Sequence, residues 1–281
     1  MKNRVIIGIA ITILCICFLT IIRDIYKSEN IFISDFFLGA IKHDKEAWFT
    51  KTNAIGHAGG IYMGKGHTNS KEAVDLYLHR TVDEEVRVLE LDFLFTSDNK
   101  LICAHLFENY KLNKNVTHDE FMKQNKLFTP IDFNDVIVYM LKNPNLYIMV
   151  DSKVENYDNR SIIDVAKYII DNSPNSIKDR FIFQLYEPEQ KLDMLKIYKF
   201  KDENLVYSLY KRYRLIGEVL DDCYKYNYNI ILYAYGYFTD SEVDRLTNDG
   251  IKSCVFTINN SDDKNYIKKA WNGIVITDYL F

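Results

Sequence analysis

The chain has 281 residues, of which 48% are hydrophobic and 26% charged, and its formal net charge is −4. This composition is ordinary for a globular protein and suffices for one large domain or two small ones. Because Lys and Arg form no block, we expect no nucleic-acid partner. The 21 Tyr and 17 Phe against 11 Gly and 4 Pro indicate strands and helices joined by few long loops.

The first segment is strongly apolar. Residues 5–22 carry no charge and are long enough to cross a bilayer. Lys2 and Arg4 precede them, which favours an N-terminus in the cytoplasm. A cleaved signal peptide would have a shorter apolar run and a small-x-small site, which is not found here. We therefore expect a single-pass cell-membrane protein with its main domain outside the cytoplasm. Its expected parts are a transmembrane anchor (1–28), a linker with a short helix (29–52) and the main domain (53–281).

Strand and helix patterns alternate from residue 53 onward. The predicted strands lie within residues 53–60, 86–95, 146–153, 180–187, 204–211, 229–238, 251–260 and 274–281. The predicted helices lie within residues 69–85, 132–143, 160–172, 188–200, 214–226, 240–250 and 261–273. A further extended run, residues 100–107, is counted as an extension of the second strand. Eight β segments alternating with helices predict an α/β fold, the (β/α)₈ TIM barrel. A doubly wound open sheet is the main rival, and the sequence lacks its GxGxxG turn.

The second predicted strand, VRVLELDFLF at residues 86–95, is apolar on both faces and yet contains two acids. Glu90 and Asp92 share a face with Val88 and Leu94, because side chains alternate along a strand. A half-exposed edge strand with solvated acids would explain them. A strand covered on both faces, as in a parallel sheet, would instead need a cation or hydrogen bonds to compensate the buried carboxylates.

Polar residues gather near the C-terminal ends of the other predicted strands too, where a barrel of this kind builds its active site. These residues, which add to Glu90 and Asp92 of the second strand, are His57, His105, Asp151, Lys153, Gln184, Tyr186, Thr257, Asn259 and Asp278. Oxygen ligands from three carboxylates suit Mg²⁺ or Ca²⁺. Two histidines can act as proton donor and acceptor on opposite sides of a scissile bond. The set fits metal-dependent phosphate chemistry.

Each of these residues also has an ordinary structural explanation. A single buried histidine such as His57 or His105 often bonds a backbone carbonyl. Asp151 would cap the loop after its strand, and Lys153 would be an exposed ladder cation. The common position of so many polar groups at strand ends favours a site over these separate explanations.

Several motifs point to one family. They are HAGG (57–60), NSKEA (69–73), ELDFLFTSDNKLICAH (90–105), VDSK (150–153), FTINN (256–260) and GIVITDYL (273–280). Over residues 53–281 the sequence resembles the glycerophosphodiester phosphodiesterase family, whose relatives include the phospholipase D toxins of spider venom. That family is a (β/α)₈ barrel with a short insertion after the second strand.

The resemblance implies roles for individual residues. Those expected to bind one divalent cation, Mg²⁺ or Ca²⁺, are Glu90, Asp92 and Asp151. His57 and His105 would be the acid–base pair, and Lys153 would contact the phosphate. The remaining strand-end residues expected to bind substrate are Gln184, Tyr186, Thr257 and Asn259.

The expected function is therefore metal-dependent hydrolysis of glycerophosphodiesters or of phospholipid headgroups. Three departures from the family pattern stand out. Asp151 replaces a glutamate, as in the venom enzymes, and Thr68-Asn69 stands where many relatives have Glu-Asn, a difference that concerns the substrate. Leu106 follows His105 where the family usually has aspartate, and this departure leaves an alternative open. The alternative is a catalytically weak barrel that binds a phosphorylated glycan or lipid.

Overall fold

The computed structural model describes residues 46–281 except 53, 125–127, 211–212 and 280–281. The predicted membrane span, residues 5–22, lies outside the described residues. Among the residues that are described, no helix is both long and apolar enough to cross a membrane.

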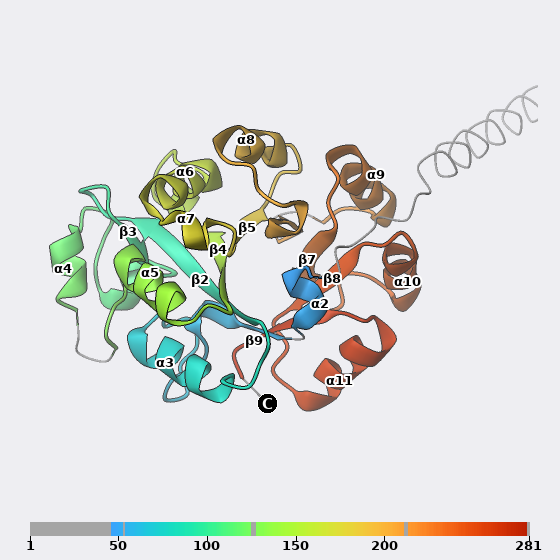
Figure 1. The fold of residues 1–281 in the computed structure, drawn as a ribbon, viewed down its shortest axis with the longest axis horizontal. Helices are drawn as coiled ribbons and strands as arrows, with labels where there is room; N and C mark the ends of the chain where they lie inside the picture. Colours follow the sequence, from blue (N-terminus) through green and yellow to red (C-terminus); the bar gives the residue numbers. More distant parts are fainter. Residues whose placement is uncertain (1–45, 53, 125–127, 211–212, 280–281) are drawn as a thin grey trace, which may run out of the picture. The chain divides into compact units, whose positions relative to one another are not determined.

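Eight parallel strands of the described chain close into a barrel (Figure 1). They are β1 (Ala54–Gly56), β2 (Arg87–Phe95), β4 (Leu146–Ser152), β5 (Phe181–Leu185), β6 (Leu205–Ser208), β7 (Ile230–Ala234), β8 (Lys252–Phe256) and β9 (Ile274–Thr277). The order runs from β1 through β9 down to β4 and β2, and β2 pairs again with β1. The predicted TIM barrel is confirmed.

Helices surround the strands (Figure 1). They are α3 (Lys71–Arg80), α4 (His118–Met122), α5 (Phe133–Lys142), α6 (Ile162–Asn172), α7 (Asn175–Lys178), α8 (Gln190–Ile197), α9 (Ile216–Tyr226), α10 (Asp240–Asn248) and α11 (Ser261–Ala270). Several begin at a side chain that accepts a hydrogen bond from the first turn, as Ser70 does for α3 and Asn260 for α11. Such caps satisfy backbone N–H groups that have no partner inside the helix.

β2 is a central strand. It pairs in parallel with β1 and with β4, and all nine of its residues are buried. The edge-strand explanation of its two acids is therefore wrong. The extended run at residues 100–107 also differs from expectation: β3 (Leu101–Cys103) turns back and pairs antiparallel with β2, with Cys103 opposite Phe93. β3 is thus an addition to the barrel, and the eight-strand count does not depend on it.

The barrel interior is apolar where the strands begin and polar where they end. Its apolar half contains Ile55, Val88, Met149, Ile182, Val206, Ile230, Cys254 and Ile274. The short helix α2 (Trp48–Lys51) closes this end, since Trp48 and Phe49 belong to the same cluster. The Trp48 indole N–H also donates to the Glu203 carbonyl at 2.8 Å, just before β6. The barrel core therefore begins before residue 53, and the polar end is left for a site.

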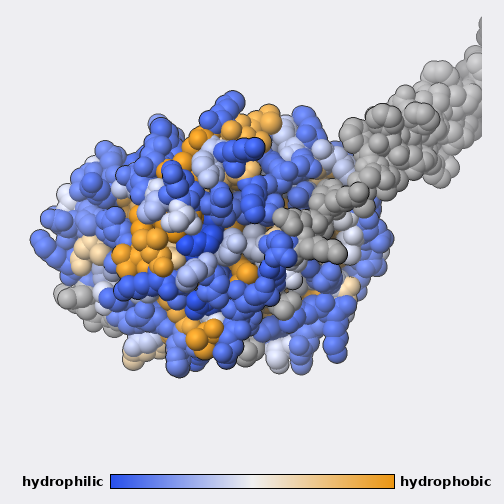
Figure 2. All heavy atoms as spheres, viewed as in Figure 1, coloured by the Kyte–Doolittle hydropathy of each residue, from blue (hydrophilic) through white to orange (hydrophobic). Residues whose placement is uncertain are grey.

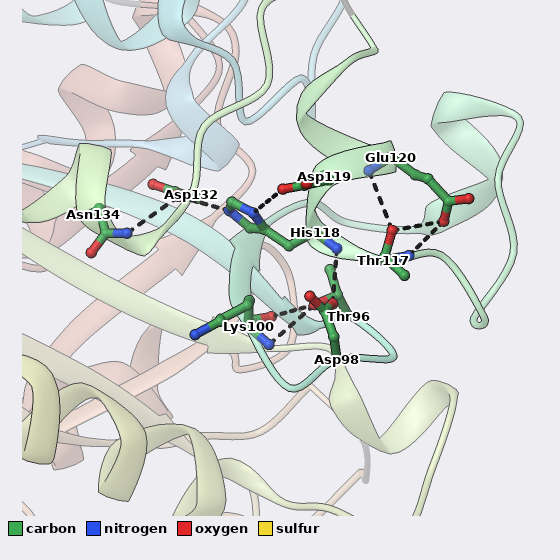
Figure 3. Close-up of polar contacts among 9 residues, drawn as sticks. All are labelled: Thr96, Asp98, Lys100, Thr117, His118, Asp119, Glu120, Asp132 and Asn134. Carbon is green, nitrogen blue, oxygen red and sulfur yellow. Dashed lines mark hydrogen bonds and ion pairs between the residues drawn. The ribbon is translucent and has the colours of Figure 1, made fainter.

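The segment between β2 and α5, residues 96–132, is called the insertion here. It contains β3, the 3₁₀ turn η2 (Phe107–Tyr110) and α4, and it buries its own apolar cluster around Phe107 and Phe121. Figure 3 shows polar contacts within it: His118 Nε2 lies 2.8 Å from Asp132 Oδ2, and the backbone N–H of His118 donates to Asp98. Asp132 also caps α5, so one carboxylate joins the insertion to a barrel helix.

The face drawn in Figure 2 is mostly hydrophilic. Its hydrophobic residues lie in separate groups, two of them over α5 and α8, where Val138, Leu141, Leu192 and Leu195 are exposed. Small separate groups of this kind are normal for a protein surface. The features that suggest chemistry lie instead at the polar end of the barrel.

Candidate active site

A cavity of about 160 Å³ lies at the C-terminal ends of the barrel strands. Seven of the ten residues predicted for the site line it: His57, Glu90, His105, Asp151, Lys153, Gln184 and Thr257. The other three contact residues around the cavity. Asp92 lies 3.2 Å from the Lys153 ammonium, Tyr186 donates to Asp151, and Asn259 donates to Asp278. The structure thus brings the predicted residues together.

Three carboxylates form the acidic part of the site. Glu90 and Asp92 follow one another on the inner face of β2, and Asp151 stands opposite Asp92 on β4. One ligand oxygen from each lies within 4.8 Å of the others. Glu90 and Asp92 are both only 2% exposed. Burial and the neighbouring Asp92 raise the pKa of Glu90 to about 8, because desolvation and a second negative charge both disfavour the ionised form.

Lys153 supplies positive charge beside these acids. Its ammonium lies 2.7 Å from Asp151 Oδ2 and 3.2 Å from Asp92 Oδ1. Burial opposes its charge, but Asp151 and Asp92 hold the pKa of Lys153 above its usual value. One ammonium would not balance three ionised carboxylates, and burial together with their mutual repulsion raises the pKa of Glu90.

Asn69 fixes Asp92. Its amide donates to Asp92 Oδ2 at 2.7 Å, and its carbonyl oxygen accepts from the Asp92 N–H at 2.9 Å. Asn69 is fully buried and has a positive φ of 45°, a conformation that Asn tolerates better than most residues. Asn69 begins the motif NSKEA, but the sequence predicted no role for it.

The three carboxylates fit a hard divalent cation. Their buried, mutually repelling oxygens are the ligands that Mg²⁺ and Ca²⁺ prefer, and Lys153 leaves their charge only partly neutralised. Glu90, Asp92 and Asp151 are the residues that would hold the ion.

His57 is held by a chain of hydrogen bonds at the rim of the cavity. It follows β1, and its Nδ1–H donates to Asp278 Oδ1 at 2.7 Å. Asn259 in turn donates to Asp278 Oδ2 at 2.7 Å. Burial opposes the imidazolium, but the bond with Asp278 and the charges of Glu90 and Asp92 raise the pKa of His57 to about 9. Asp278, which follows β9, thus orients the His57 ring through Nδ1. The second ring nitrogen, Nε2, is left for proton transfer.

Glu90 also holds the turn after β1 by a hydrogen bond. The Ala58 N–H donates to Glu90 Oε2 at 2.5 Å. Ala58 has a φ of 46°, which is uncommon for a residue with a Cβ. This hydrogen bond therefore joins the HAGG turn to β2.

His105 also lines the cavity, two residues beyond β3. The Ala104 N–H donates to the Asp92 carbonyl at 2.9 Å and so anchors the backbone there. Among the described residues, no carboxylate or carbonyl bonds the His105 ring. Its ring contact is with His67, at 5.2 Å between centroids, and His67 lies 4.4 Å from His57. A third histidine thus separates the two predicted catalytic ones.

Three polar residues of the cavity were missed in the sequence: His67, Ser208 and Tyr210. His67 lies in a loop with no periodic pattern, and the only signal was its place ten residues after His57. Burial and the neighbouring charge of His57 lower the pKa of His67. Ser208 ends β6 and is 1% exposed, and its hydroxyl has no hydrogen-bond partner among the described residues. A buried hydroxyl that faces the cavity is suited to a substrate contact.

Comparison with solved structures identifies the architecture. A glycerophosphodiester phosphodiesterase described as putative, from Galdieria sulphuraria, aligns with a TM-score of 0.65 at 14% identity, over 81% of this chain and 94% of that one. A phosphodiesterase from Oleispira antarctica, solved with the product sn-glycerol-3-phosphate, aligns at 0.63 and 13%, over 83% and 95%. The glycerophosphodiester phosphodiesterase of Thermotoga maritima aligns at 0.59 and 20%, over 81% and 94%.

The fold is that of the glycerophosphodiester phosphodiesterases. No family model matches the sequence, and no curated protein does. The likeness to these phosphodiesterases is therefore one of fold, at low identity. In a barrel of this fold, the C-terminal ends of the strands form the face that carries the active site, and the polar residues of this chain lie there.

Proposed function

We propose that this protein is a metal-dependent phosphodiesterase that hydrolyses glycerophosphodiesters or phospholipid headgroups. One observation carries the proposal: two histidines and a lysine line one cavity, and three clustered carboxylates, two of them buried, lie beside them. Fold alone does not establish activity. The argument therefore rests on these side chains, and the fold of the neighbouring phosphodiesterases supports it.

Each group has a role in phosphodiester cleavage. A divalent cation held by the three acids would neutralise phosphate charge and lower the barrier to attack. Lys153 would bind a phosphate oxygen from the side of β4. One histidine would take the proton of a substrate hydroxyl as that oxygen bonds to phosphorus. The other histidine would give a proton to the departing alkoxide as its P–O bond breaks. Water would then open the cyclic phosphate.

A catalytically weak barrel that binds a phosphorylated glycan or lipid is the second candidate. The observation in its favour is the His105 ring, which no described hydrogen-bond acceptor holds in place. If His105 is too poorly oriented for proton transfer, the cavity would bind phosphate without cleaving it.

Hydrolysis measured on the full chain separates the two. The substrates are glycerophosphocholine, glycerophosphoglycerol and a lysophospholipid, each with Mg²⁺, with Ca²⁺ and with EDTA. We expect release of a phosphomonoester or a cyclic phosphate that EDTA abolishes and added cation restores. Phosphate binding without cleavage of any diester would support the second candidate, and cleavage that is indifferent to EDTA would contradict the metal site.

We also propose that the catalytic domain lies outside the cytoplasm, anchored in the cell membrane by residues 5–22. The support is the uncharged run itself and the positive charges before it. Protease added to intact cells should digest the barrel and leave the N-terminus protected. Recovery of the whole chain in the soluble cytoplasmic fraction would contradict this topology.

A further inference from the structure

A second, larger hollow adjoins the catalytic cavity. It measures about 790 Å³ and is called the outer groove here. Its lining residues are Lys65–Thr68, His105, Asn109–Leu112, Gln124 and Phe128. His67 and His105 line both hollows, so the groove opens directly beside the predicted acid–base pair. The inner cavity is smaller than pockets that enclose drug-sized ligands, about 300–1,000 Å³, whereas the groove falls within that range.

The outer groove is positively charged in a protein whose net charge is −4. Two lysines, Lys65 and Lys111, line it, and none of its described lining residues is acidic. Among the described residues, no carboxylate lies within ion-pair distance of either ammonium. Glu108, the acid next to the groove in sequence, is engaged by the Tyr157 hydroxyl. Two unpaired ammonium groups beside one hollow attract an anion and repel a cation.

Apolar side chains form the rest of the groove. Phe128, Leu112 and Tyr110 are each partly buried and line it. The Lys65 ammonium lies 5.9 Å from the centre of the Phe128 ring, and the Tyr110 hydroxyl donates to the Thr68 carbonyl at 2.8 Å. The insertion and the β1–α3 loop therefore face each other across a surface with apolar sides and two cationic groups.

A phosphodiester has two alcohol arms, and these two hollows differ in what they accept. With the phosphate beside Lys153 and the acids, an alcohol arm that outgrows the small inner cavity reaches the groove past His67 and His105, which line both hollows. The shape and charge of the groove then select this alcohol.

We propose that the outer groove binds the larger alcohol arm of the substrate, and that this alcohol carries an acidic group on a carbon skeleton larger than glycerol. This proposal rests on the phosphodiesterase function proposed above. It disfavours choline and ethanolamine, whose positive charge would face Lys65 and Lys111.

Kinetics with a matched pair of substrates test this preference. Glycerophosphoinositol and glycerophosphoinositol 4-phosphate differ by one phosphate on the alcohol. We expect kcat/KM to be about tenfold higher for the charged substrate, and this ratio to fall as salt screens the lysines. The double variant Lys65→Gln/Lys111→Gln should bring the ratio close to one. Lys114→Gln, which removes an exposed lysine outside the groove lining, should leave the ratio unchanged.

Binding of octanoate and of octyltrimethylammonium, measured by calorimetry, provides a second readout that does not depend on turnover. The wild type should bind octanoate and not the cation, and the double variant should bind octanoate about tenfold more weakly. Diester cleavage without charge preference, together with no charge-dependent octanoate binding, would overturn the groove proposal and leave the phosphodiesterase standing. Charge-dependent octanoate binding without cleavage of any diester would do the reverse.

Discussion

The two histidines of the site are held in different ways. His57 belongs to the barrel: its ring bonds Asp278, and Asn259 holds Asp278 in turn. His105 belongs to the insertion side: its backbone is anchored to β2, while its ring meets only the edge of His67 among the described aromatic rings. The first histidine is fixed before any substrate arrives. The second has a fixed position but an orientation that its neighbours do not determine.

This difference suggests a division of labour. Catalytic groups work best when their own supports lock them in place, and His57 has such support. His105 lies where the inner cavity meets the outer groove, so a bound alcohol arm can complete its orientation. We infer that His57, held by the barrel, keeps one orientation for every substrate. The orientation of His105, on the insertion side, would depend on which substrate is bound. Leu106, the residue after His105, has no side-chain acceptor that could hold the His105 ring.

Removing either imidazole should have the largest effect. His57→Ala and His105→Ala should each lower kcat by roughly 10² or more, since proton transfer by a positioned side chain contributes about 10²–10⁴. Steady-state kinetics with a good diester measure this, and circular dichroism checks the fold. His79→Ala, at an exposed histidine on α3, is the matched control and should keep full activity. Near-normal turnover in both site variants would refute the acid–base pair.

Breaking the support of His57 should have an intermediate effect. In Asp278→Asn the carboxylate that stabilises the imidazolium is gone, so the pKa of His57 should fall from about 9 toward its ordinary value. NMR titration of the imidazole in metal-free protein measures the shift, and kcat should fall about tenfold. The same substitution at Asp244, an exposed acid on α10, should change neither quantity.

The raised pKa of His57 also gives stability a pH dependence. A group whose pKa is higher in the folded protein stabilises it fully below the unfolded value, about 6.5, and this contribution is lost as pH rises through about 9. Between these limits the free energy of unfolding should fall more steeply with pH in the wild type than in Asp278→Asn. Equal slopes in denaturant titrations would show that Asp278 does not raise the pKa.

His67 should matter least. His67→Ala removes ring contacts with both histidines, and aromatic contacts of this kind contribute about 0.5–1.5 kcal/mol. We expect a few-fold loss in kcat/KM. His67→Phe keeps a ring in this place and should restore most of the activity. If phenylalanine is as damaging as alanine, the imidazole of His67 takes part in the chemistry and the two-histidine account is incomplete.

Sequence reasoning reached the parts of the site that follow from strand geometry. The two-residue period placed Glu90 and Asp92 on the inner face of β2, and parallel pairing brought Asp151 next to them. His57 was found because it follows a barrel strand at the end where sites form. These inferences need only local periodicity and the rule for the fold. His105 was expected at the end of an extension of β2, but it follows the antiparallel β3, so the rule for barrel strands does not explain its position.

The remaining features depend on contacts that no local pattern contains. Asp278 was placed at a strand end, but its bond to His57 joins residues 221 positions apart. His67 and Asn69 lie in a loop with positive φ values, so their directions follow from the path of the chain. Trp48 reaches the barrel floor from a helix too short to show a period. The direction of β3 was missed because an extended pattern does not say which way the chain runs.

The central claim is that the three carboxylates bind a divalent cation, and the melting temperature of the full chain with and without Mg²⁺ or Ca²⁺ tests it most directly. A ligand that binds only the folded state stabilises it by about 2.7 kcal/mol at a hundred times its Kd, so the wild type and Asp244→Asn should melt higher with cation. In Glu90→Gln the side-chain carbonyl can still accept the Ala58 hydrogen bond. The double variant Glu90→Gln/Asp92→Asn should therefore fold, but its melting temperature should no longer rise with cation. A wild-type melting temperature that neither cation changes would contradict the metal site, and with it the phosphodiesterase as proposed.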